Sequence, residues 1–181
     1  MRVVSGSRKG TPLKSLPGNL TRPTSDKVKE SLFNIIGPYF DGGIAVELFG
    51  GSGSLSIESL SRGADQAYIF EKNPKACSII RDNVEKCRFT DQVHISRNDA
   101  RNAIRALPAD IQIDLLFIDP PYAETKFYDL AERIAQAGML SERAIIICEH
   151  EKQLTLPDAY QEFQKTKNPI YGNSAISIYM K

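Results

Sequence analysis

Along most of the chain, short uninterrupted apolar runs alternate with stretches whose apolar positions repeat every three to four residues. Apolar runs that end at turn residues are typical of buried strands, and the longer periodic stretches are typical of helices that pack on a sheet. This alternation predicts a mostly parallel sheet with helices on both faces. The predicted strands cover residues 44–49, 66–71, 92–96, 113–119 and 143–150, and the predicted helices cover residues 54–63, 74–87, 100–107 and 126–138.

The two ends of the chain depart from this alternation. Residues 159–168 and 174–181 alternate apolar with polar positions, which predicts two further strands that pair antiparallel at the sheet edge and bring the total to seven. Before residue 44, a leading segment over residues 22–40 holds a helix capped by Thr24 or Ser25. Residues 1–21 predict one or two short strands with turns, or a partly mobile arm.

Length and composition favour one soluble α/β domain over residues 1–181, with residues 44–181 as its core. The three cysteines include no C-x-x-C pair, which predicts a reduced, cytoplasmic protein without disulfides. With only two histidines, we expect no metal site, and no apolar run is long enough to predict a membrane segment or a signal peptide.

Positive charge is concentrated near the start of the chain. The first 36 residues carry seven Lys and Arg against two acidic residues, a net charge of +5, whereas the whole chain carries only +1 and the remainder therefore −4. A basic arm on a mildly acidic body predicts contact with phosphates, although a solubilising tail fits the composition equally well. The candidate phosphate contacts are Arg2, Arg8, Lys9, Lys14 and Arg22.

Ligands of parallel α/β sheets bind at the carboxyl ends of the strands, so the residues after each predicted strand are the candidate site. The first such segment, residues 47–53, reads Glu-Leu-Phe-Gly-Gly-Ser-Gly and predicts a tight turn that a ligand can approach closely. A dinucleotide fingerprint is incomplete because Ser56 stands at its third glycine position. Glu47 would repel a phosphate and suits a ligand that carries a cation. The candidate binding residues here are Glu47, Phe49, Gly51, Ser52 and Gly53.

Polar residues also follow the second and third strands. Glu71 comes 18 residues after Gly53, and an acid near this offset accepts hydrogen bonds from ribose hydroxyls. Asp99 suits the exocyclic amine of an adenine, although it suits a helix cap equally well. Together these residues predict a nucleoside ligand with a cationic group and no phosphate, which suggests S-adenosylmethionine. The further candidates for binding it are Lys72, Asn98 and Ala100.

The fourth strand stops abruptly at Asp119-Pro120-Pro121-Tyr122, because proline cannot donate to a strand ladder. An exocyclic amine on a base is a poor nucleophile, since its lone pair is delocalised into the ring. The Asp119 carboxylate and the Pro120 carbonyl can each accept one of its N–H bonds and so direct the lone pair toward a methyl group. Pro121 stiffens the turn and Tyr122 can stack on the base, which makes all four residues catalytic candidates.

These motifs resemble, in order and spacing, the Rossmann-like class I methyltransferases that modify amino groups. That class usually has Asp where this chain has Glu47. Residues 22–36, Arg-Pro-Thr-Ser-Asp-Lys-Val-Lys-Glu-Ser-Leu-Phe-Asn-Ile-Ile, are similar in particular to the RsmD-like family of bacterial 16S ribosomal RNA guanine-N2 methyltransferases. This narrower resemblance covers nearly the whole chain, as far as the closing Tyr-Gly-Asn-Ser-Ala-Ile-Ser-Ile-Tyr-Met-Lys.

The resemblance implies methyl transfer from S-adenosylmethionine to guanine N2 of 16S ribosomal RNA, with the target base unstacked. It implies the small ribosomal subunit or an assembly intermediate as the partner, and we expect a monomer. Arg22 and Thr24 would reach the edge of the site, or else serve only the start of the helix.

The motifs alone leave other functions open. Adenine N6, cytosine N4 and a glutamine amide present similar amino groups, although a DNA enzyme would need a recognition domain for which this chain has no segment. A ribosome-assembly module that binds RNA without catalysis is the non-enzymatic alternative, and the intact Asp119-Pro120-Pro121-Tyr122 argues against it.

Overall fold

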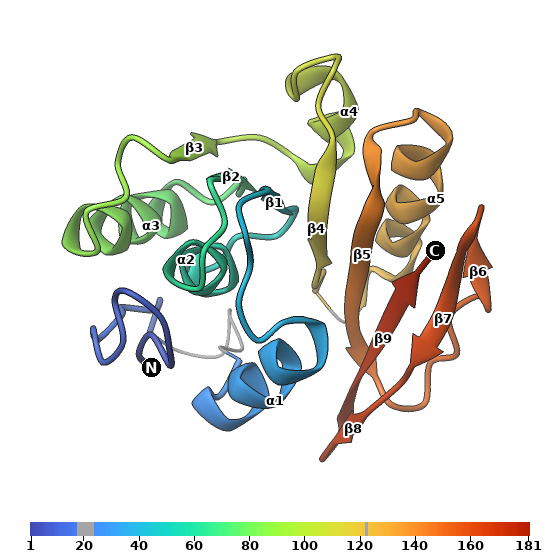
Figure 1. Ribbon diagram of the computed structural model, residues 1–181, viewed down its shortest axis with the longest axis horizontal. Helices are drawn as coiled ribbons and strands as arrows, with labels where there is room; N and C mark the ends of the chain where they lie inside the picture. The colour runs from blue at the N-terminus through green and yellow to red at the C-terminus, as the bar shows by residue number, and fades with distance from the viewer. Residues whose placement is uncertain (18–23, 122) are drawn as a thin grey trace.

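Five parallel strands form the centre of the computed structural model, which describes residues 1–17, 24–121 and 123–181. The strand order β3-β2-β1-β4-β5 reverses direction between β1 and β4, so neighbouring connections leave the sheet on opposite faces there (Figure 1). In open α/β sheets, ligands bind at such a reversal, outside the carboxyl ends of the strands. The strands are β1 (Ile44–Glu47), β2 (Gln66–Phe70), β3 (Val93–Ser96), β4 (Ile113–Ile118) and β5 (Leu140–Glu151).

Antiparallel strands extend the sheet beyond β5. Strand β9 (Ser174–Met180) lies between β5 and β7 (Phe163–Lys167) and is antiparallel to both. The two-residue strands β6 (Ala159–Tyr160) and β8 (Ile170–Tyr171) pair with β7 and β9. The predicted seven-stranded sheet with an antiparallel edge is confirmed, with these two short strands in addition.

One predicted strand is wrong in detail. Residues 159–168 do not form a single strand, because the chain reverses at Gln161, whose φ of 54° is left-handed. Tyr160 and Phe163 on either side of the reversal then pair with each other across a hairpin. The turn contains no Gly, Pro or Asn, so the sequence carried no turn signal at this point.

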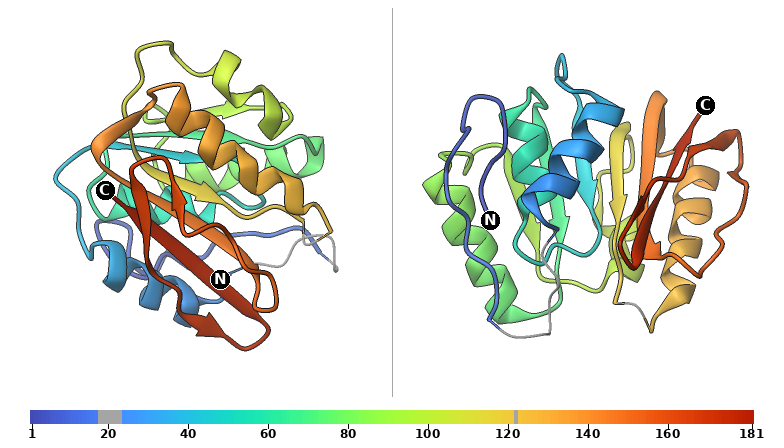
Figure 2. Two further views of the ribbon diagram at one scale, coloured as in Figure 1. Left: turned by 90° about the vertical axis from the view of Figure 1, so that its right-hand side faces the viewer. Right: turned by 90° about the horizontal axis from the view of Figure 1, so that it is seen from below.

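Helices cover both faces of the sheet, as predicted (Figure 2). One apolar core joins the sheet to α1 (Asp26–Ile36), α2 (Ser54–Ser61) and α3 (Pro74–Lys86). The other core joins the opposite face to η1 (Ala100–Asn102), α4 (Ala103–Ala106), η2 (Thr125–Tyr128) and α5 (Asp129–Gln136). Within the described ranges, none of the helices is long and apolar enough to cross a membrane.

The buried face of α1 includes a charged residue. Ser25, one of the two predicted caps, accepts a hydrogen bond from the Val28 N–H and so begins the helix. Val28 and Ile35 are half-buried, whereas Lys29 and Phe33 are fully buried. A lysine at a core position needs partners, and its partners come from other segments of the chain.

Residues 1–17, here called the N-terminal strap, pack along α2 and α3 (Figure 1). Val3 and Leu13 are buried in the same core as α2, and the Lys14 N–H donates to Asn83 Oδ1 at 2.9 Å. The alternative of a mobile arm is therefore wrong for this segment. Residues 18–21, the end of the predicted arm, lie outside the described residues.

A buried ionic cluster on α2 holds the strap in place. The Glu58 carboxylate is fully buried and accepts the backbone N–H groups of Val4 at 2.9 Å and Ser5 at 3.0 Å. It also pairs with Arg62 Nε at 2.7 Å and with Lys29 Nζ at 3.5 Å. Burial lowers the pKa of Lys29, while the charge of Glu58 acts against that change. Lys29, Glu58 and Arg62 thus share one buried site beneath the strap.

Candidate active site

A cavity of about 560 Å³ lies at the carboxyl ends of the parallel strands. Its walls include the segments after β1, β2, β3 and β4 that the strand-end rule singled out. The volume is within the range of sites that bind small molecules and cofactors. Of the residues predicted to bind a ligand, those that line the cavity are Glu47, Phe49, Gly51, Ser52, Glu71, Lys72, Asn98, Asp99, Ala100, Asp119, Pro120 and Pro121.

The glycine turn after β1 forms the floor of the cavity. A side chain at Gly50 would lie 2.6 Å from Ile69 Cγ2, so only glycine lets the turn pack against β2. Gly51 faces the cavity, whereas Gly53 packs against Ile80 behind the turn and is not a lining residue. The prediction that Gly53 contacts a ligand thus finds no support in its position, although its φ of 78° requires glycine for the turn.

Glu71 links two backbone segments at the cavity. Its Oε1 accepts the Gly51 N–H at 2.9 Å, and its Oε2 accepts the Asn73 N–H at 2.9 Å. Asn73 in turn caps α3, as predicted, with its side chain bound to the Lys75 and Ala76 N–H groups. The carboxylate is therefore held rigidly, and each oxygen retains a second lone pair directed outward from these bonds.

Glu47 is a buried carboxyl group in the cavity wall, with 5% of its surface exposed. Its Oε1 accepts Ser56 Oγ at 2.7 Å and the Ser56 N–H at 3.2 Å. Burial raises the pKa of Glu47 to about 8, with a smaller contribution from the charge of Glu71 and opposition from the two Ser56 bonds. Ser56, which breaks the dinucleotide fingerprint, is thus the partner of this acid. A cation bound nearby would favour the ionised carboxylate.

Asp99 occupies the helix-cap position that local sequence also allowed. Its Oδ1 accepts the Arg101 N–H at 2.8 Å and caps η1. The same carboxylate forms a two-point ion pair with Arg101, at 3.0 Å from Nε and 2.9 Å from Nη2. These Arg101 hydrogen bonds lower the pKa of Asp99 to about 2. Asp99 lines the cavity as a fixed anion, and a role toward adenine remains a prediction.

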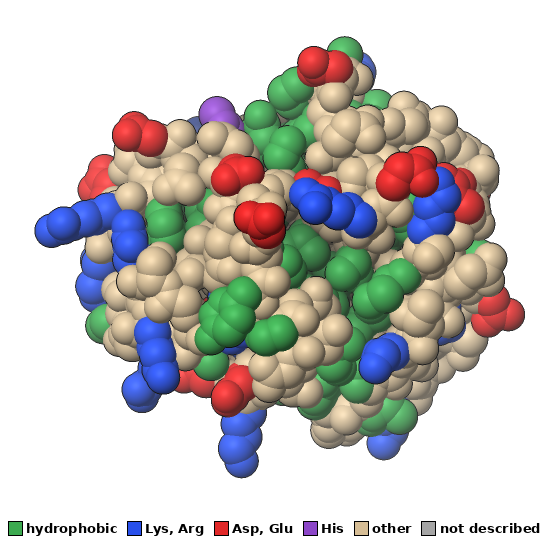
Figure 3. Space-filling model, in the orientation of Figure 1, with side chains coloured by type: hydrophobic (Ala, Val, Ile, Leu, Met, Phe, Trp, Pro, Cys, Tyr) green, Lys and Arg blue, Asp and Glu red, His purple; other side chains and the backbone are tan. Residues whose placement is uncertain are grey.

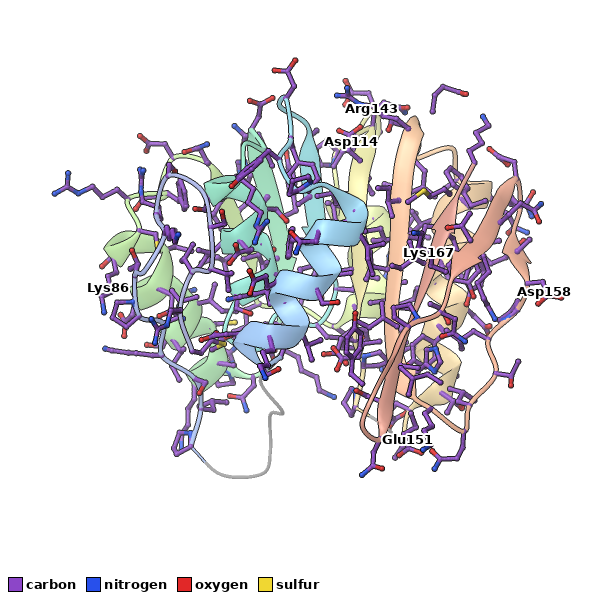
Figure 4. All side chains as sticks on the ribbon, turned by 60° about the horizontal axis from the view of Figure 1, so that its bottom comes forward. Lys86, Asp114, Arg143, Glu151, Asp158 and Lys167 are labelled. Carbon is purple, nitrogen blue, oxygen red and sulfur yellow. The ribbon has the colours of Figure 1, made fainter. Side chains whose placement is uncertain are left out.

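Asp119 ends β4 at the cavity, half-buried between β1 and β5. Pro120 is buried and Pro121 is exposed, so the chain turns outward immediately after the strand. At the amino-terminal ends of β4 and β5, Asp114 Oδ1 and Arg143 Nε lie 3.3 Å apart. This ion pair is far from the cavity (Figure 4). Tyr122 and Arg22, two of the predicted site residues, lie outside the described residues.

Basic residues of the strap do not line the cavity. Arg8 is held against the body, where its Nε donates to the Cys87 carbonyl and its guanidinium lies 4.7 Å from the Phe89 ring centre. Arg2 pairs with Asp26 and Lys14 pairs with Asp82, while Lys9 is exposed. Figure 3 shows Lys and Arg scattered over this face, at its left and lower margins and also near its centre and upper right, rather than in one patch. Their proposed contact with RNA remains a prediction, whereas Thr24 does line the cavity.

Several cavity residues were not predicted. The strap contributes Ser15 and Leu16, which only tertiary packing could reveal. Phe127 lines the wall and packs edge-on against Phe49 with ring centres 5.0 Å apart. Glu149 at the end of β5 also lines it, and the strand-end rule should have included this residue. Its neighbour His150 instead faces the core, with Nε2 2.7 Å from Ser177 Oγ.

The same fold occurs in solved methyltransferase structures. One of these, "Putative methyltransferase yhhF" from Escherichia coli, is 25% identical to this chain, with a TM-score of 0.84 over 100% of this chain and 97% of that chain. The strand order, the antiparallel edge and the cavity at the strand ends define the chain as a class I methyltransferase, a class of enzymes that use S-adenosylmethionine.

The particular family is shown by sequence. Residues 1–180 match the family model described as "Conserved hypothetical protein 95", and the chain belongs to that family. It is 42% identical to "Putative rRNA methyltransferase YlbH" of Bacillus subtilis over 100% of this chain and 99% of that protein. It is 30% identical to "Ribosomal RNA small subunit methyltransferase D" of Haemophilus influenzae over 86% of this chain and 81% of that protein. The predicted RsmD-like membership is thereby confirmed.

Proposed function

We propose that the protein transfers a methyl group from S-adenosylmethionine to the exocyclic N2 amino group of a guanine in 16S ribosomal RNA. The observation that carries the proposal is the placement of Asp119 and Pro120 in one cavity with the glycine turn, Glu47 and Glu71. The residues suited to bind the cofactor and the residues suited to accept the amino hydrogens thus line the same cavity. The named activity of the relatives supports ribosomal RNA as the substrate class.

The cavity residues fit this cofactor by their chemistry. Glu71, fixed by two backbone N–H groups, is suited to accept the ribose hydroxyls. Glu47 is suited to the cationic part, because its burial makes ionisation costly unless a positive charge compensates. Gly50 and Gly51 leave the turn without side chains where the ligand must approach. When bound, S-adenosylmethionine supplies an electrophilic methyl group on a sulfonium sulfur.

The catalytic role falls to the Asp119 turn. The Asp119 carboxylate and the Pro120 carbonyl accept the two amino hydrogens, which orients the nitrogen lone pair away from the ring plane and toward the methyl group. Formation of the new N–C bond would break the bond between the methyl carbon and the sulfur, whose electron pair stays on the sulfur, and would place a positive charge on the nitrogen beside the Asp119 carboxylate. One amino proton would then leave, with the Asp119 carboxylate as its acceptor.

The substrate determines where the protein works. A base can enter the cavity only when it is unstacked, so we expect a loop of the 16S RNA in a small subunit or an assembly intermediate, in the cytoplasm. We expect a monomer, with charged residues of the strap and Thr24 near the RNA.

A tritium-transfer assay tests the proposal. Labelled S-adenosylmethionine is offered to small subunits from cells that lack this protein, and the nucleosides of the product are separated. We expect label in N2-methylguanosine of 16S RNA. Label in a methyladenosine would be consistent with the proposed role of Asp119 but would refute guanine as the substrate. Absence of label on RNA, DNA and protein acceptors, despite cofactor binding, would favour the RNA-binding module.

Cofactor binding is expected to release a proton from Glu47. Between pH 4.5 and 8 the folded protein holds a proton that the unfolded chain releases, so this group makes the folded state less stable as pH rises through that window. A cation beside Glu47 reverses the preference, and binding at pH 7 should release roughly 0.9 proton. Calorimetry in buffers of different ionisation enthalpy measures this number.

The substitution Glu47→Gln provides the control, because it keeps the shape of the side chain and removes its proton. Its binding enthalpy should no longer depend on the buffer, whereas Glu85→Gln on the exposed side of α3 should behave as the unaltered protein. Equal proton release by all three proteins would show that Glu47 is not the group that titrates.

A further inference from the structure

Asp119 has a second carboxylate beside it in the cavity. The parallel register pairs Phe117 of β4 with Ile147 of β5 and continues through the next residue pair. Continued by one residue past Ile118, where β4 ends, this register places Asp119 next to Glu149. Adjacent strands are about 4.8 Å apart, so the two residues are near neighbours. Both line the cavity, and both are half-buried.

The two side chains also share one face of the sheet. Side chains alternate along a strand, so Asp119 follows Phe117 and Glu149 follows Ile147. Phe117 and Ile147 both belong to the core beneath α1 and α2. The backbone of Glu149 is held from the other side, because the Tyr128 hydroxyl donates to its carbonyl. The strand ends thus present two acids side by side toward the cavity.

Only one of the candidate amino substrates offers two neighbouring donors. In guanine, the N2 amino group is adjacent to the N1–H, which is also a donor. In adenine the amino group is adjacent to N1, in cytosine it is adjacent to N3, and in a glutamine amide it is adjacent to the carbonyl oxygen, all of which are acceptors. A carboxylate accepts hydrogen bonds and donates none, so it attracts the first arrangement and repels the other three.

We propose that Glu149 determines specificity by accepting the N1–H of the target guanine while Asp119 accepts the amino group. This inference rests on the function proposed above and deepens it, because it assigns the choice among purines to a residue of this chain. A site built to bind a substrate N–H rejects analogues that lack it by large factors, since its own polar group is left unpaired.

The variant Glu149→Gln tests the proposal, with Glu151→Gln as its matched control. Glu151 is the next residue on the same face of β5, is exposed at the strand end and does not line the cavity (Figure 4). Because glutamine keeps one acceptor oxygen for the N1–H but loses the charge, we expect Glu149→Gln to lower kcat/KM for the guanine substrate about 10-fold while cofactor affinity stays within about twofold. Glu151→Gln should match the unaltered protein in both measurements.

A base analogue separates recognition from a structural effect. RNA that carries 2,6-diaminopurine at the modified position keeps the 2-amino group but replaces the N1–H by an acceptor. The unaltered enzyme should prefer guanine strongly. Glu149→Gln should lose most of this preference, because a glutamine amide donates to the analogue's N1 as well as it accepts from guanine. A merely structural role of Glu149 would lower both rates and leave their ratio unchanged.

The outcomes distinguish this inference from the proposed function. If the unaltered enzyme methylates guanine N2 and Glu149→Gln keeps its rate, or keeps its preference over 2,6-diaminopurine, the role of Glu149 is refuted and the function stands. If the unaltered enzyme methylates adenine, or no base at all, both fail together.

Discussion

Replacement of Asp119 by alanine is expected to lower the rate of methyl transfer about 10³-fold or more. The substitution removes the acceptor for an amino hydrogen and the negative charge beside the nitrogen as the N–C bond forms, and the loss of one such preorganised group typically costs 10²–10³-fold. RNA binding should stay within about threefold, because we expect the phosphate contacts to come from the strap and not from Asp119. Single-turnover measurements at saturating cofactor, together with RNA binding at fixed salt, check both results.

Two further variants define what the loss means. Asp119→Asn keeps the shape and one acceptor oxygen, so its rate should lie between those of the alanine variant and the unaltered enzyme. Asp110→Ala changes an exposed acid just before β4, at the end away from the cavity, and should leave the rate unchanged. An alanine variant at position 119 that retains more than a tenth of the rate would contradict the catalytic assignment.

Glu58→Ala is expected to have the largest effect on stability, a loss of about 3–5 kcal/mol in the free energy of unfolding. The alanine leaves the buried cations of Lys29 and Arg62 without their counter-charge, and it leaves the N–H groups of Val4 and Ser5 without this acceptor. This loss of stability reflects buried charged and polar groups that are left without partners. It is not the net contribution of the ion pairs to the free energy of unfolding. Urea unfolding followed by circular dichroism measures the loss.

The exposed Glu85→Ala on α3 is the matched control and should change stability by no more than about 0.5 kcal/mol. Glu58→Gln keeps one acceptor oxygen and should fall between the two. If Glu58→Ala unfolds within about 1 kcal/mol of the unaltered protein, the cluster does not hold the strap.

Much of the fold could be predicted because most strands of the parallel sheet are apolar runs that begin or end near Gly, Pro or Asn. The carboxyl ends of those strands then located the candidate site without knowledge of any contact. The hairpin at Gln161 escaped prediction because its turn lacks the residues that favour a left-handed conformation. The burial of Lys29 and Glu58 was not predicted because these two residues pair with each other although they are 29 positions apart along the chain.

Single residues of the site were harder to assign than its location. Asp99 can cap a helix or bind a ligand, and only the observed hydrogen bond from the Arg101 backbone N–H shows that it caps η1. Glu149 could be recognised as the neighbour of Asp119 only from the pairing register of β4 and β5. The sequence of one strand does not show which residue of the adjacent strand lies beside Asp119. Local pattern therefore located the site, and tertiary pairing was needed to distinguish the residues within it.

The strap has a consequence for synthesis of the chain on the ribosome. Its residues leave the exit tunnel well before their binding partners are made: Glu58 is 54 residues beyond Val4, and Asn83 is 69 residues beyond Lys14. The nascent strap must therefore remain undocked until α2 and α3 have emerged. Since Ser15 and Leu16 form part of the cavity wall, that wall can be completed only after this late docking of the strap.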